Sequence, residues 1–382
     1  MEFRGLNVRG YKRLRKVTLD LAPFNVLIGP NGVGKSSILE VLDLLAASAD
    51  SRLEHTISQG GGITSLITQD GSTDLIELGL EQPMKSGGAS NYHLRLSPAG
   101  IGYKIDLEEL SLVDGSSTNS YQLIDARSGY IHYFKKQGKF IEPNWEYHSQ
   151  ETALSQVPKM YKAHEGFRSL VASATKIYHT LDVSPRAPIR TPQSLQPAGT
   201  PGVNGETLLS CLYALRENEP DRYEAVIDAL RAAFPTFQKL DLPIVAAGTV
   251  TLRWNDRDFT GPIYPHQLSE GTLRFLWLVT LLQSPGLPRV TVIDEPEVSL
   301  HPEMLRLLTE LMREAATRTQ LIVATHSDRL VRFLKPEELV VCDLGDDGGT
   351  LVRRADKLDL DKWLSDYALD ELWSMGRLGG RS

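Results

Sequence analysis

A glycine-rich segment near the start of the chain constrains the fold most strongly. The apolar run Val26–Ile28 leads into Gly29-Pro-Asn-Gly-Val-Gly34-Lys35-Ser36, which fits G-x-x-x-x-G-K-[ST] at every fixed position. An apolar-periodic segment follows directly, with Ile38, Leu39, Val41, Leu42 and Leu45. A strand, a loop and a helix in this order are the context in which the pattern binds phosphate. The alternative is an ordinary glycine-rich turn between a strand and a helix.

The residue types in this loop explain the chemistry. Glycines allow backbone N–H groups to close around phosphate oxygens, and the helix that begins near Lys35 adds its positive end. The Lys35 ammonium would reach the outer phosphates, and the Ser36 hydroxyl would be a ligand of Mg²⁺. We therefore predict a nucleotide-binding segment made of Gly29, Pro30, Asn31, Gly32, Val33, Gly34, Lys35, Ser36 and Ser37.

Two adjacent carboxylates follow a second apolar run, Val290–Ile293. The run predicts a buried parallel strand that delivers Asp294 and Glu295 at its carboxyl end, where α/β sheets bind ligands. Asp294 would hold Mg²⁺, and Glu295 would polarise the attacking water as a general base. Two carboxylates that merely cap the loop after a strand are the alternative.

Two further segments carry candidate site residues. His326 follows the apolar strand that ends at Ala324, where its imidazole could bind the γ-phosphate and the water. Ser269 precedes Gly271 and an apolar helical segment, so it is either an N-cap or part of an anion site at a helix N-terminus. A lone histidine at a strand end is otherwise incidental.

The composition limits the classes of protein that the chain can belong to. Its 382 residues are 41% hydrophobic and 23% charged, as in ordinary globular proteins, and allow two or three domains. The net charge of −7 argues against a surface covered with nucleic-acid-binding groups. Only two cysteines and no apolar run near 18 residues predict a cytoplasmic protein with no membrane contact.

The pattern of apolar residues predicts a split α/β core. Strands are expected at 3–8, 17–21 and 25–28, and the segment from 74 to 135 predicts an antiparallel sheet of short strands. Helical spacing marks 158–179 and 206–234, and strand and helix alternate again from 239 to 344. We expect an ATPase-core segment at 1–150, a helical insertion at 151–238, a second core segment at 239–345 and a tail at 346–382.

A basic segment, Arg9 to Lys16, lies between the first two predicted strands and carries five positive charges with no acidic residue. It is a solvated hairpin turn, a contact to nucleotide or a contact to the phosphate backbone of nucleic acid. The residue types alone leave these alternatives open.

The ordered segments GPNGVGKS, LSEGT, VTVIDEP and ATHS resemble the ATP-binding-cassette (ABC) ATPase superfamily. Within it, the chain is similar to the soluble branch of RecF, Rad50, SMC heads and the overcoming-lysogenization-defect (OLD) ATPases. The segment DEPEVSLHP resembles the DEPExxLHP segment of OLD-like predicted ATPases. The resemblance implies a P-loop NTPase of ABC-ATPase type, with a mixed core sheet, an antiparallel β-subdomain and an inserted helical lobe. Glu270 stands where transporters have Gly, which favours the non-transporter branch.

The resemblance also implies partners for the site. Ser269 and Gly271 would touch the γ-phosphate of ATP held by another subunit, so two copies arranged head to tail would form a homodimer around two ATP molecules. The segment from Glu297 to His301 would lie at that interface. Lys12 and Arg13 match a loop that approaches nucleotide in relatives. For the family's magnesium-sensing glutamine, Gln156 fits best, and Gln150 is the rival.

The leading functional prediction is an ATPase whose nucleotide-driven dimerisation switches a DNA-related or antiphage-defence partner. OLD proteins carry a Toprim nuclease after the ATPase, whereas the tail here, with Asp356, Asp359, Asp361, Asp366 and Asp370, suggests a solvated helix. We therefore expect a separate effector protein, a nuclease or a toxin, with DNA as a further candidate partner. The alternatives are a transporter's nucleotide-binding subunit and a slow ATP-gated DNA clamp or scaffold.

Overall fold

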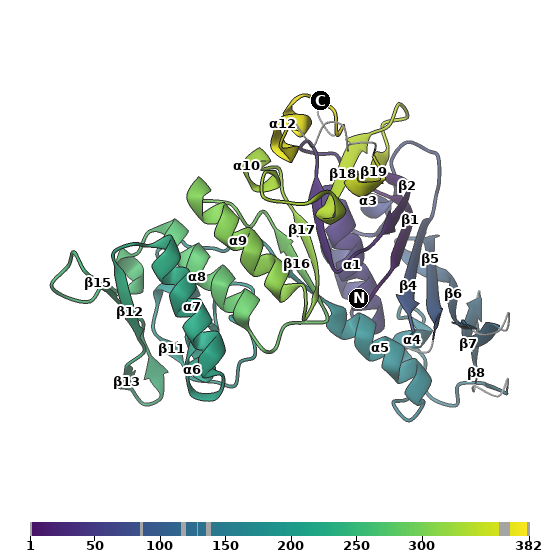
Figure 1. Ribbon diagram of the computed structural model, residues 1–382. Helices are drawn as coiled ribbons and strands as arrows, with labels where there is room; N and C mark the ends of the chain where they lie inside the picture. Colours follow the sequence, from purple (N-terminus) through teal and green to yellow (C-terminus); the bar gives the residue numbers. More distant parts are fainter. Residues whose placement is uncertain are drawn as a thin grey trace. The chain divides into compact units, whose positions relative to one another are not determined.

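The computed structural model describes residues 2–84, 87–115, 120–127, 129–134, 139–358 and 367–379 (Figure 1). Contacts within the chain divide it into two compact units. Residues 1–176 together with 335–382 form unit 1, and residues 177–334 form unit 2. Unit 1 is thus assembled from both ends of the chain.

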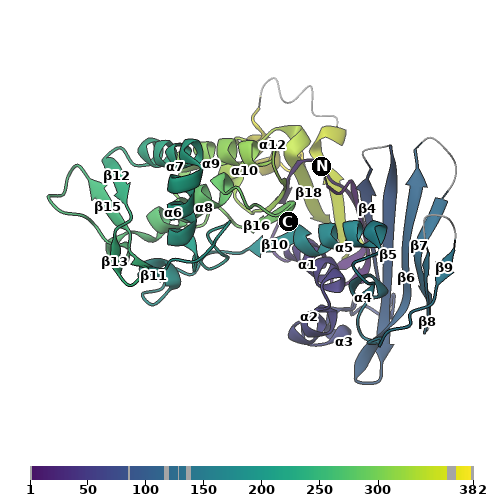
Figure 2. The ribbon, with the colours of Figure 1, turned by 90° about the horizontal axis from the view of Figure 1, so that it is seen from below.

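An eight-stranded antiparallel sheet with the order β2-β1-β4-β5-β6-β7-β8-β9 is the largest part of unit 1 (Figure 2). Its strands are β1 (Gly5–Tyr11), β2 (Leu14–Asp20), β4 (Ile76–Pro83), β5 (Gly88–Ala99), β6 (Gly102–Asp114), β7 (Ser120–Arg127), β8 (Tyr130–Phe134) and β9 (Phe140–Ile141). The register pairs buried residues across strands, for example Leu78 with Leu94 and Leu80 with Tyr92. Such alternation places one face of a sheet against a core. The predicted antiparallel β-subdomain is confirmed.

Three further strands of unit 1 bring distant parts of the chain together. β3 (Phe24–Ile28) is buried at every residue and pairs in parallel with β18 (Leu339–Leu344). β18 in turn pairs antiparallel with β19 (Thr350–Arg354), and β19 contacts β2. A strand that is buried on both faces needs a continuous apolar run, which is the pattern at residues 26–28.

The helices of unit 1 lie beside these strands. α1 (Lys35–Ala49) contacts α5 (Lys162–Ala174), and both are visible next to each other in Figure 2. The apolar-periodic residues predicted for α1 are buried. The shorter helices are α2 (Leu53–Gln59), α3 (Ile63–Leu66), α4 (Ala153–Gln156) and α12 (Leu369–Ser374), with 3₁₀ turns at Pro336–Glu338 and Ala355–Lys357.

One predicted helix is shorter than expected. The helical spacing at 158–179 predicted a single helix, whereas α5 ends at Ala174 and β10 (Thr175–Tyr178) follows. Thr, Ile and Tyr in this segment favour extended backbone, since β-branched and aromatic side chains fit strands better than helices. The prediction was wrong over these last residues for that reason.

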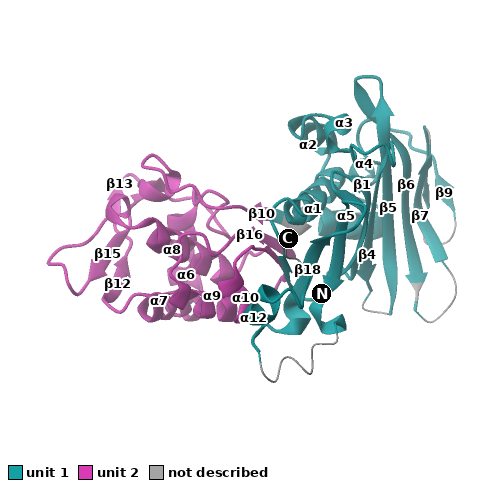
Figure 3. Cartoon of the chain, turned by 90° about the horizontal axis from the view of Figure 1, so that it is seen from above, with its two compact units in different colours: residues 1–176, 335–382 teal, residues 177–334 magenta. Residues whose placement is uncertain are grey.

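Unit 2, magenta in Figure 3, combines a parallel strand pair with a group of helices. β16 (Val290–Asp294) pairs in parallel with β17 (Gln320–Ala324), with Ile293 opposite Val323. The helices are α6 (Leu208–Asn218), α7 (Pro220–Ala233), α8 (Glu270–Gln283), α9 (Pro302–Ala315) and α10 (Asp328–Val331). α8 contacts α6, α7 and α9, and most of its side chains are buried.

Short strands complete unit 2. β12 (Phe237–Asp241) pairs with β15 (Arg253–Asp256), and β11 (Gln193–Ser194), β14 (Thr249–Val250) and β13 (Ile244–Ala246) form a three-stranded sheet in that order. Two 3₁₀ turns lie at Pro188–Arg190 and Pro265–Gln267. The aromatic rings of Phe237, Trp254, Phe234 and Phe275 pack against one another in sequence, with adjacent ring centroids 4.4, 5.3 and 5.8 Å apart.

The predicted segment boundaries at residues 150, 238 and 345 stay predictions. The contacts group α4 and α5 with unit 1, and α6 and α7 with unit 2. In the tail, Asp359, Asp361 and Asp366 lie outside the described residues. Within the part of the chain that the structure describes, no helix is both long enough and apolar enough to cross a membrane.

Arg354 fastens the end of β19 inside unit 1. Only 8% of the residue is exposed. Its guanidinium donates to the backbone oxygen of Asp20 at 3.2 Å, to Asn25 Oδ1 at 3.1 Å and to the backbone oxygen of Glu337. The planar fork of an arginine can satisfy several acceptors at once, which a lysine cannot.

We therefore expect Arg354→Ala to lower the stability of the protein by about 2 to 4 kcal/mol, because buried acceptors lose their donors. Arg354→Lys should lose part of that stability. Arg353→Ala is the matched control, since the Arg353 side chain on the same strand is 55% exposed. Thermal unfolding measures all three, and equal melting temperatures for the two alanine variants would contradict the anchoring role.

Candidate functional site

The glycine-rich loop of unit 1 connects β3 to α1, as the sequence predicts. Gly29, Gly32 and Gly34 have φ angles of 149°, 74° and 111°. These values lie in the region that side chains rarely adopt, so the path of this loop depends on glycine. Val33 is fully buried, whereas Asn31 and Gly32 are exposed at the tip of the loop.

Lys35 points back over the loop. Its Nζ donates to the backbone oxygen of Gly29 at 2.6 Å and to that of Pro30 at 3.1 Å, and 7% of the residue is exposed. The ammonium is therefore held beside the backbone that would surround a phosphate group.

The first turn of α1 fits an anion and a hard cation. Gly34 is the N-cap residue and has no side chain with which to cap the helix. The first N–H groups of a helix need acceptors, and the helix dipole favours a negative charge at this end. Ser36 is exposed, and its hydroxyl is an oxygen ligand of the kind that Mg²⁺ prefers. The residues present thus fit a phosphate group with its Mg²⁺ ion.

Two residues of the basic segment, Lys12 and Arg13, have partners nearby in unit 1. Lys12, with φ of 46°, places its Nζ 2.5 Å from Glu40 Oε2 on α1. Arg13 is exposed, and its backbone oxygen accepts the N–H of Thr350 at 3.0 Å. The roles predicted for Lys12 and Arg13 at a nucleotide stay predictions.

Gln156 ends α4, and both ends of its amide bind the backbone. Its Oε1 accepts the N–H of His148 at 2.7 Å, and its Nε2 donates to the backbone oxygens of His148 and Glu151, both at 3.0 Å. The rival Gln150 uses its backbone oxygen to accept the Tyr103 hydroxyl at 2.5 Å. The magnesium-sensing role of either glutamine remains a prediction.

In unit 2, β16 delivers the two predicted carboxylates at its end. Asp294 Oδ2 lies 3.4 Å from His179 Nδ1. Glu295 has a φ of 52°, so the chain turns sharply at this residue. Because of this turn, the side chains of Asp294 and Glu295 point in different directions.

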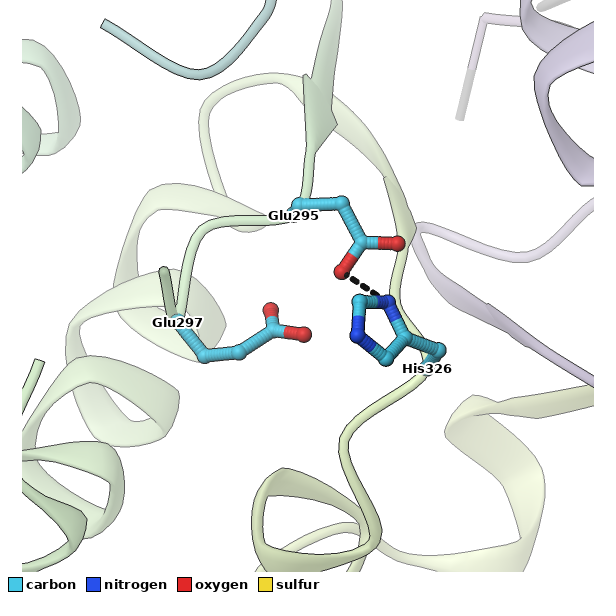
Figure 4. A group of neighbouring side chains, drawn as sticks. All are labelled: Glu295, Glu297 and His326. Carbon is cyan, nitrogen blue, oxygen red and sulfur yellow. Dashed lines mark ion pairs between the residues drawn. The ribbon is translucent and has the colours of Figure 1, made fainter. Parts of the chain in front are cut away.

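Three side chains converge at the ends of β16 and β17 (Figure 4). His326 Nδ1 lies 2.7 Å from Glu295 Oε2, although the two groups are not aligned as a hydrogen bond. The contact is attractive when Nδ1 carries its proton. Glu297 reaches the same place, and one ligand atom from each of Glu295, Glu297 and His326 lies within 4.8 Å of the other two, close enough for these residues to hold a metal ion.

Glu297 is fixed from behind by Thr325. The buried Thr325 hydroxyl donates to Glu297 Oε1 at 2.5 Å and accepts the N–H of Ser327 at 2.9 Å. Burial, followed by the neighbouring carboxylate of Glu295, raises the pKa of Glu297 to about 8. Two neighbouring carboxylates in a poorly solvated place favour one shared proton. The family resemblance implied only an interface position for Glu297, and the signal for its place in this cluster is its position two residues after Glu295.

Ser269 and Gly271 begin α8. Ser269 Oγ accepts the N–H of Thr272 at 3.1 Å, so this residue is an N-cap and is also exposed. A Cβ on Gly271 would lie 2.4 Å from the backbone oxygen of Ser299, which has a φ of 64°. The start of α8 is thereby packed against the turn that follows β16. The predicted contact of Ser269 and Gly271 with a partner's ATP stays a prediction.

Comparisons with known proteins identify relatives of the chain. Residues 24–332 match the family described as "AAA domain, putative AbiEii toxin, Type IV TA system". The chain is 24% identical over 406 residues to an OLD nuclease of Thermus scotoductus, covering 98% of this chain and 67% of that protein.

Two solved structures are similar in fold. One is an SmcHead bound to the C-winged helix domain of ScpA, with a TM-score of 0.55, 13% identity and coverage of 96% of this chain and 100% of that chain. The other is a Smc head domain with an extended coiled coil bound to the C-terminal domain of ScpA derived from Pyrococcus furiosus, with a TM-score of 0.55, 11% identity and coverage of 96% and 99%. The predicted ABC-type P-loop NTPase fold and the OLD-like, SMC-like resemblance are confirmed.

The raised pKa of Glu297 predicts a pH dependence of stability. The unfolded chain releases this proton near the ordinary value of 4.5, whereas the folded protein keeps it up to about 8. The folded state binds more protons between these values, so stability falls as pH rises from about 4.5 to about 8. Glu297→Gln mimics the protonated form and should remove this loss.

We expect Glu297→Gln to melt at the same temperature as the parent protein near pH 5 and roughly a few degrees higher near pH 8.5. Glu310→Gln is the control, because the Glu310 side chain on α9 is 54% exposed. A difference between the Glu297 variant and the parent protein that does not change with pH would contradict the assignment.

Proposed function

The chain belongs to the family described as "AAA domain, putative AbiEii toxin, Type IV TA system", and from this premise we propose that it binds ATP with Mg²⁺ and hydrolyses the ATP. The observation that carries the proposal is the loop between β3 and α1. Its glycines adopt positive φ angles, its lysine ammonium is folded over the loop backbone, and the helix that follows has no side-chain cap. Together, these three features allow the loop to bind a phosphate group, and an ordinary turn needs none of them.

Each residue has a role in this proposal. The backbone N–H groups of the segment from Gly29 to Ser37, in which Pro30 has none, surround the phosphates, and Lys35 neutralises the outer ones. Ser36 and Asp294 supply oxygen ligands for Mg²⁺, which offsets charge on the phosphates. Gln156 is the proposed magnesium sensor, and Lys12 and Arg13 approach the nucleotide.

Hydrolysis is assigned to the cluster at the ends of β16 and β17. Glu295 orients and deprotonates the attacking water as general base. His326, which lies 2.7 Å from Glu295, holds that carboxylate and binds the γ-phosphate. Thr325 holds Glu297 beside these two residues.

We propose further that ATP joins two copies of the chain. Ser269 and Gly271 of one copy touch the γ-phosphate held by the other, and the segment from Glu297 to His301 lies at the contact. ATP then favours the dimer because ADP lacks the bridging group, and only such differential binding can shift an equilibrium. The similarity to an OLD nuclease and to Smc heads bound to a partner supports an output through another protein. We assign that output to a separate nuclease or toxin effector, with DNA as a candidate ligand and antiphage defence as the role.

Lys35→Ala tests nucleotide binding. The variant loses the only side-chain cation of the loop, and we expect its affinity for a fluorescent ATP analogue to fall by roughly tenfold to a hundredfold. The control is Lys239→Ala, because the Lys239 side chain is 64% exposed on β12. Equal ATP affinity of the Lys35 variant and the parent protein would overturn the assignment of the loop.

Glu295→Gln separates binding from hydrolysis. Loss of the base should reduce the rate of phosphate release by roughly a hundredfold or more while ATP binding is retained. A dimer of this variant should therefore accumulate when ATP is added, which light scattering would measure. A variant that binds ATP but stays monomeric at high protein concentration would contradict the proposed dimer, and full hydrolysis would contradict the role of Glu295.

A further inference from the structure

Thr350 lies directly behind the glycine-rich loop of residues 29–37, which we call the phosphate loop. It contacts Val33 of this loop although the two residues are 317 positions apart in the sequence. It is the first residue of β19, and 3% of it is exposed. Its hydroxyl donates to the backbone oxygen of Val33 at 2.6 Å, and its backbone N–H donates to the oxygen of Arg13 at 3.0 Å. One residue therefore connects the loop with the basic turn between β1 and β2.

The same hydroxyl occupies the space behind Gly34. A Cβ built on Gly34 would lie 2.5 Å from Thr350 Oγ1 and 3.2 Å from Leu14 Cδ2. Gly34 has a φ of 111° and is the N-cap of α1, so the loop enters the helix at this point. The position of Thr350 thus limits the conformation of the peptide groups on both sides of Gly34.

Thr350 is itself held in place by the hairpin between β18 and β19. Gly345 N–H donates to the oxygen of Gly349 at 2.8 Å, and Thr350 is registered opposite Leu344. The Arg15 guanidinium on β2 lies 3.1 Å from Asp347 Oδ2 in the hairpin turn and 2.5 Å from Asp70 Oδ2. These contacts join the hairpin to β2 and to Asp70.

We propose that Thr350 is a positioning residue that holds the phosphate loop in its anion-binding conformation before nucleotide arrives. This inference rests on the proposed ATP site and adds a residue that the loop motif does not contain. Without the hydroxyl, the Val33 peptide loses a buried donor, and the loop can adopt other conformations. Apparent affinity then falls in proportion to the fraction of molecules that keep the binding conformation.

The test compares Thr350→Val with Thr350→Ser. Valine keeps the branched shape and removes the hydroxyl, whereas serine keeps the hydroxyl. Thr319→Val is the matched control in unit 2, because Thr319 is 5% exposed and its hydroxyl donates to the backbone oxygen of Pro288 at 2.7 Å. Thermal unfolding checks that each variant is folded.

Two measurements follow on the full chain. The first is hydrogen exchange of peptides that cover residues 29–37 in the absence of nucleotide. We expect faster exchange in Thr350→Val, and exchange like that of the parent protein in Thr350→Ser and Thr319→Val. The second is affinity for the fluorescent ATP analogue, which should be about tenfold weaker in Thr350→Val and restored in Thr350→Ser.

The outcomes separate the two proposals. If Thr350→Val exchanges and binds like the parent protein while Lys35→Ala loses ATP, the role of Thr350 is wrong and the ATP site stands. If Thr319→Val weakens ATP binding as much as Thr350→Val, the effect is general destabilisation and the positioning role is wrong. If the parent protein binds no ATP, the proposed function fails, and the exchange measurement still decides whether Thr350 holds the loop.

Discussion

The pairing of β3 with β18 is the constraint on which the phosphate loop depends. Val341 is registered opposite Ile28, the last residue of β3, so the next backbone oxygen of β18, that of Cys342, lies against Gly29. A Cβ on Gly29 would be 2.2 Å from that oxygen. The chain can leave the strand at this point only through a residue without a side chain, and this fixes where the loop begins.

The carboxylates after β16 lie close together, so the repulsion between them has to be offset by neighbouring groups. Glu295 and Glu297, which are both half-buried, approach each other, and His326 and Thr325 contact them from two sides. Such a group of charges is costly in a folded protein unless its members share protons or bind cations. Such a cluster is typical of a catalytic site rather than of a structural contact, since apolar residues in these positions would give a more stable fold.

The sequence predicted a large part of this architecture because its signals are local. The glycine-rich loop, the apolar run before Asp294 and the alternation in the antiparallel sheet each depend on neighbouring residues. The predicted helix and strand boundaries were less accurate, as the end of α5 illustrates. Whether a short segment with β-branched residues forms a helix or a strand depends on the residues it packs against. The family resemblance assigned Glu297 to an interface, and the residue pattern carries no information on the proximity of Thr325.

The sequence by itself determined that the chain has a phosphate loop, two adjacent carboxylates after a buried strand, and the sheet and helices that present them. Only the tertiary structure decided that Thr350 supports the loop and that Glu297 joins Glu295 and His326. The physical reason is that a backbone motif encodes its own φ angles, whereas a contact between residues tens or hundreds of positions apart exists only after the strands that carry them have paired.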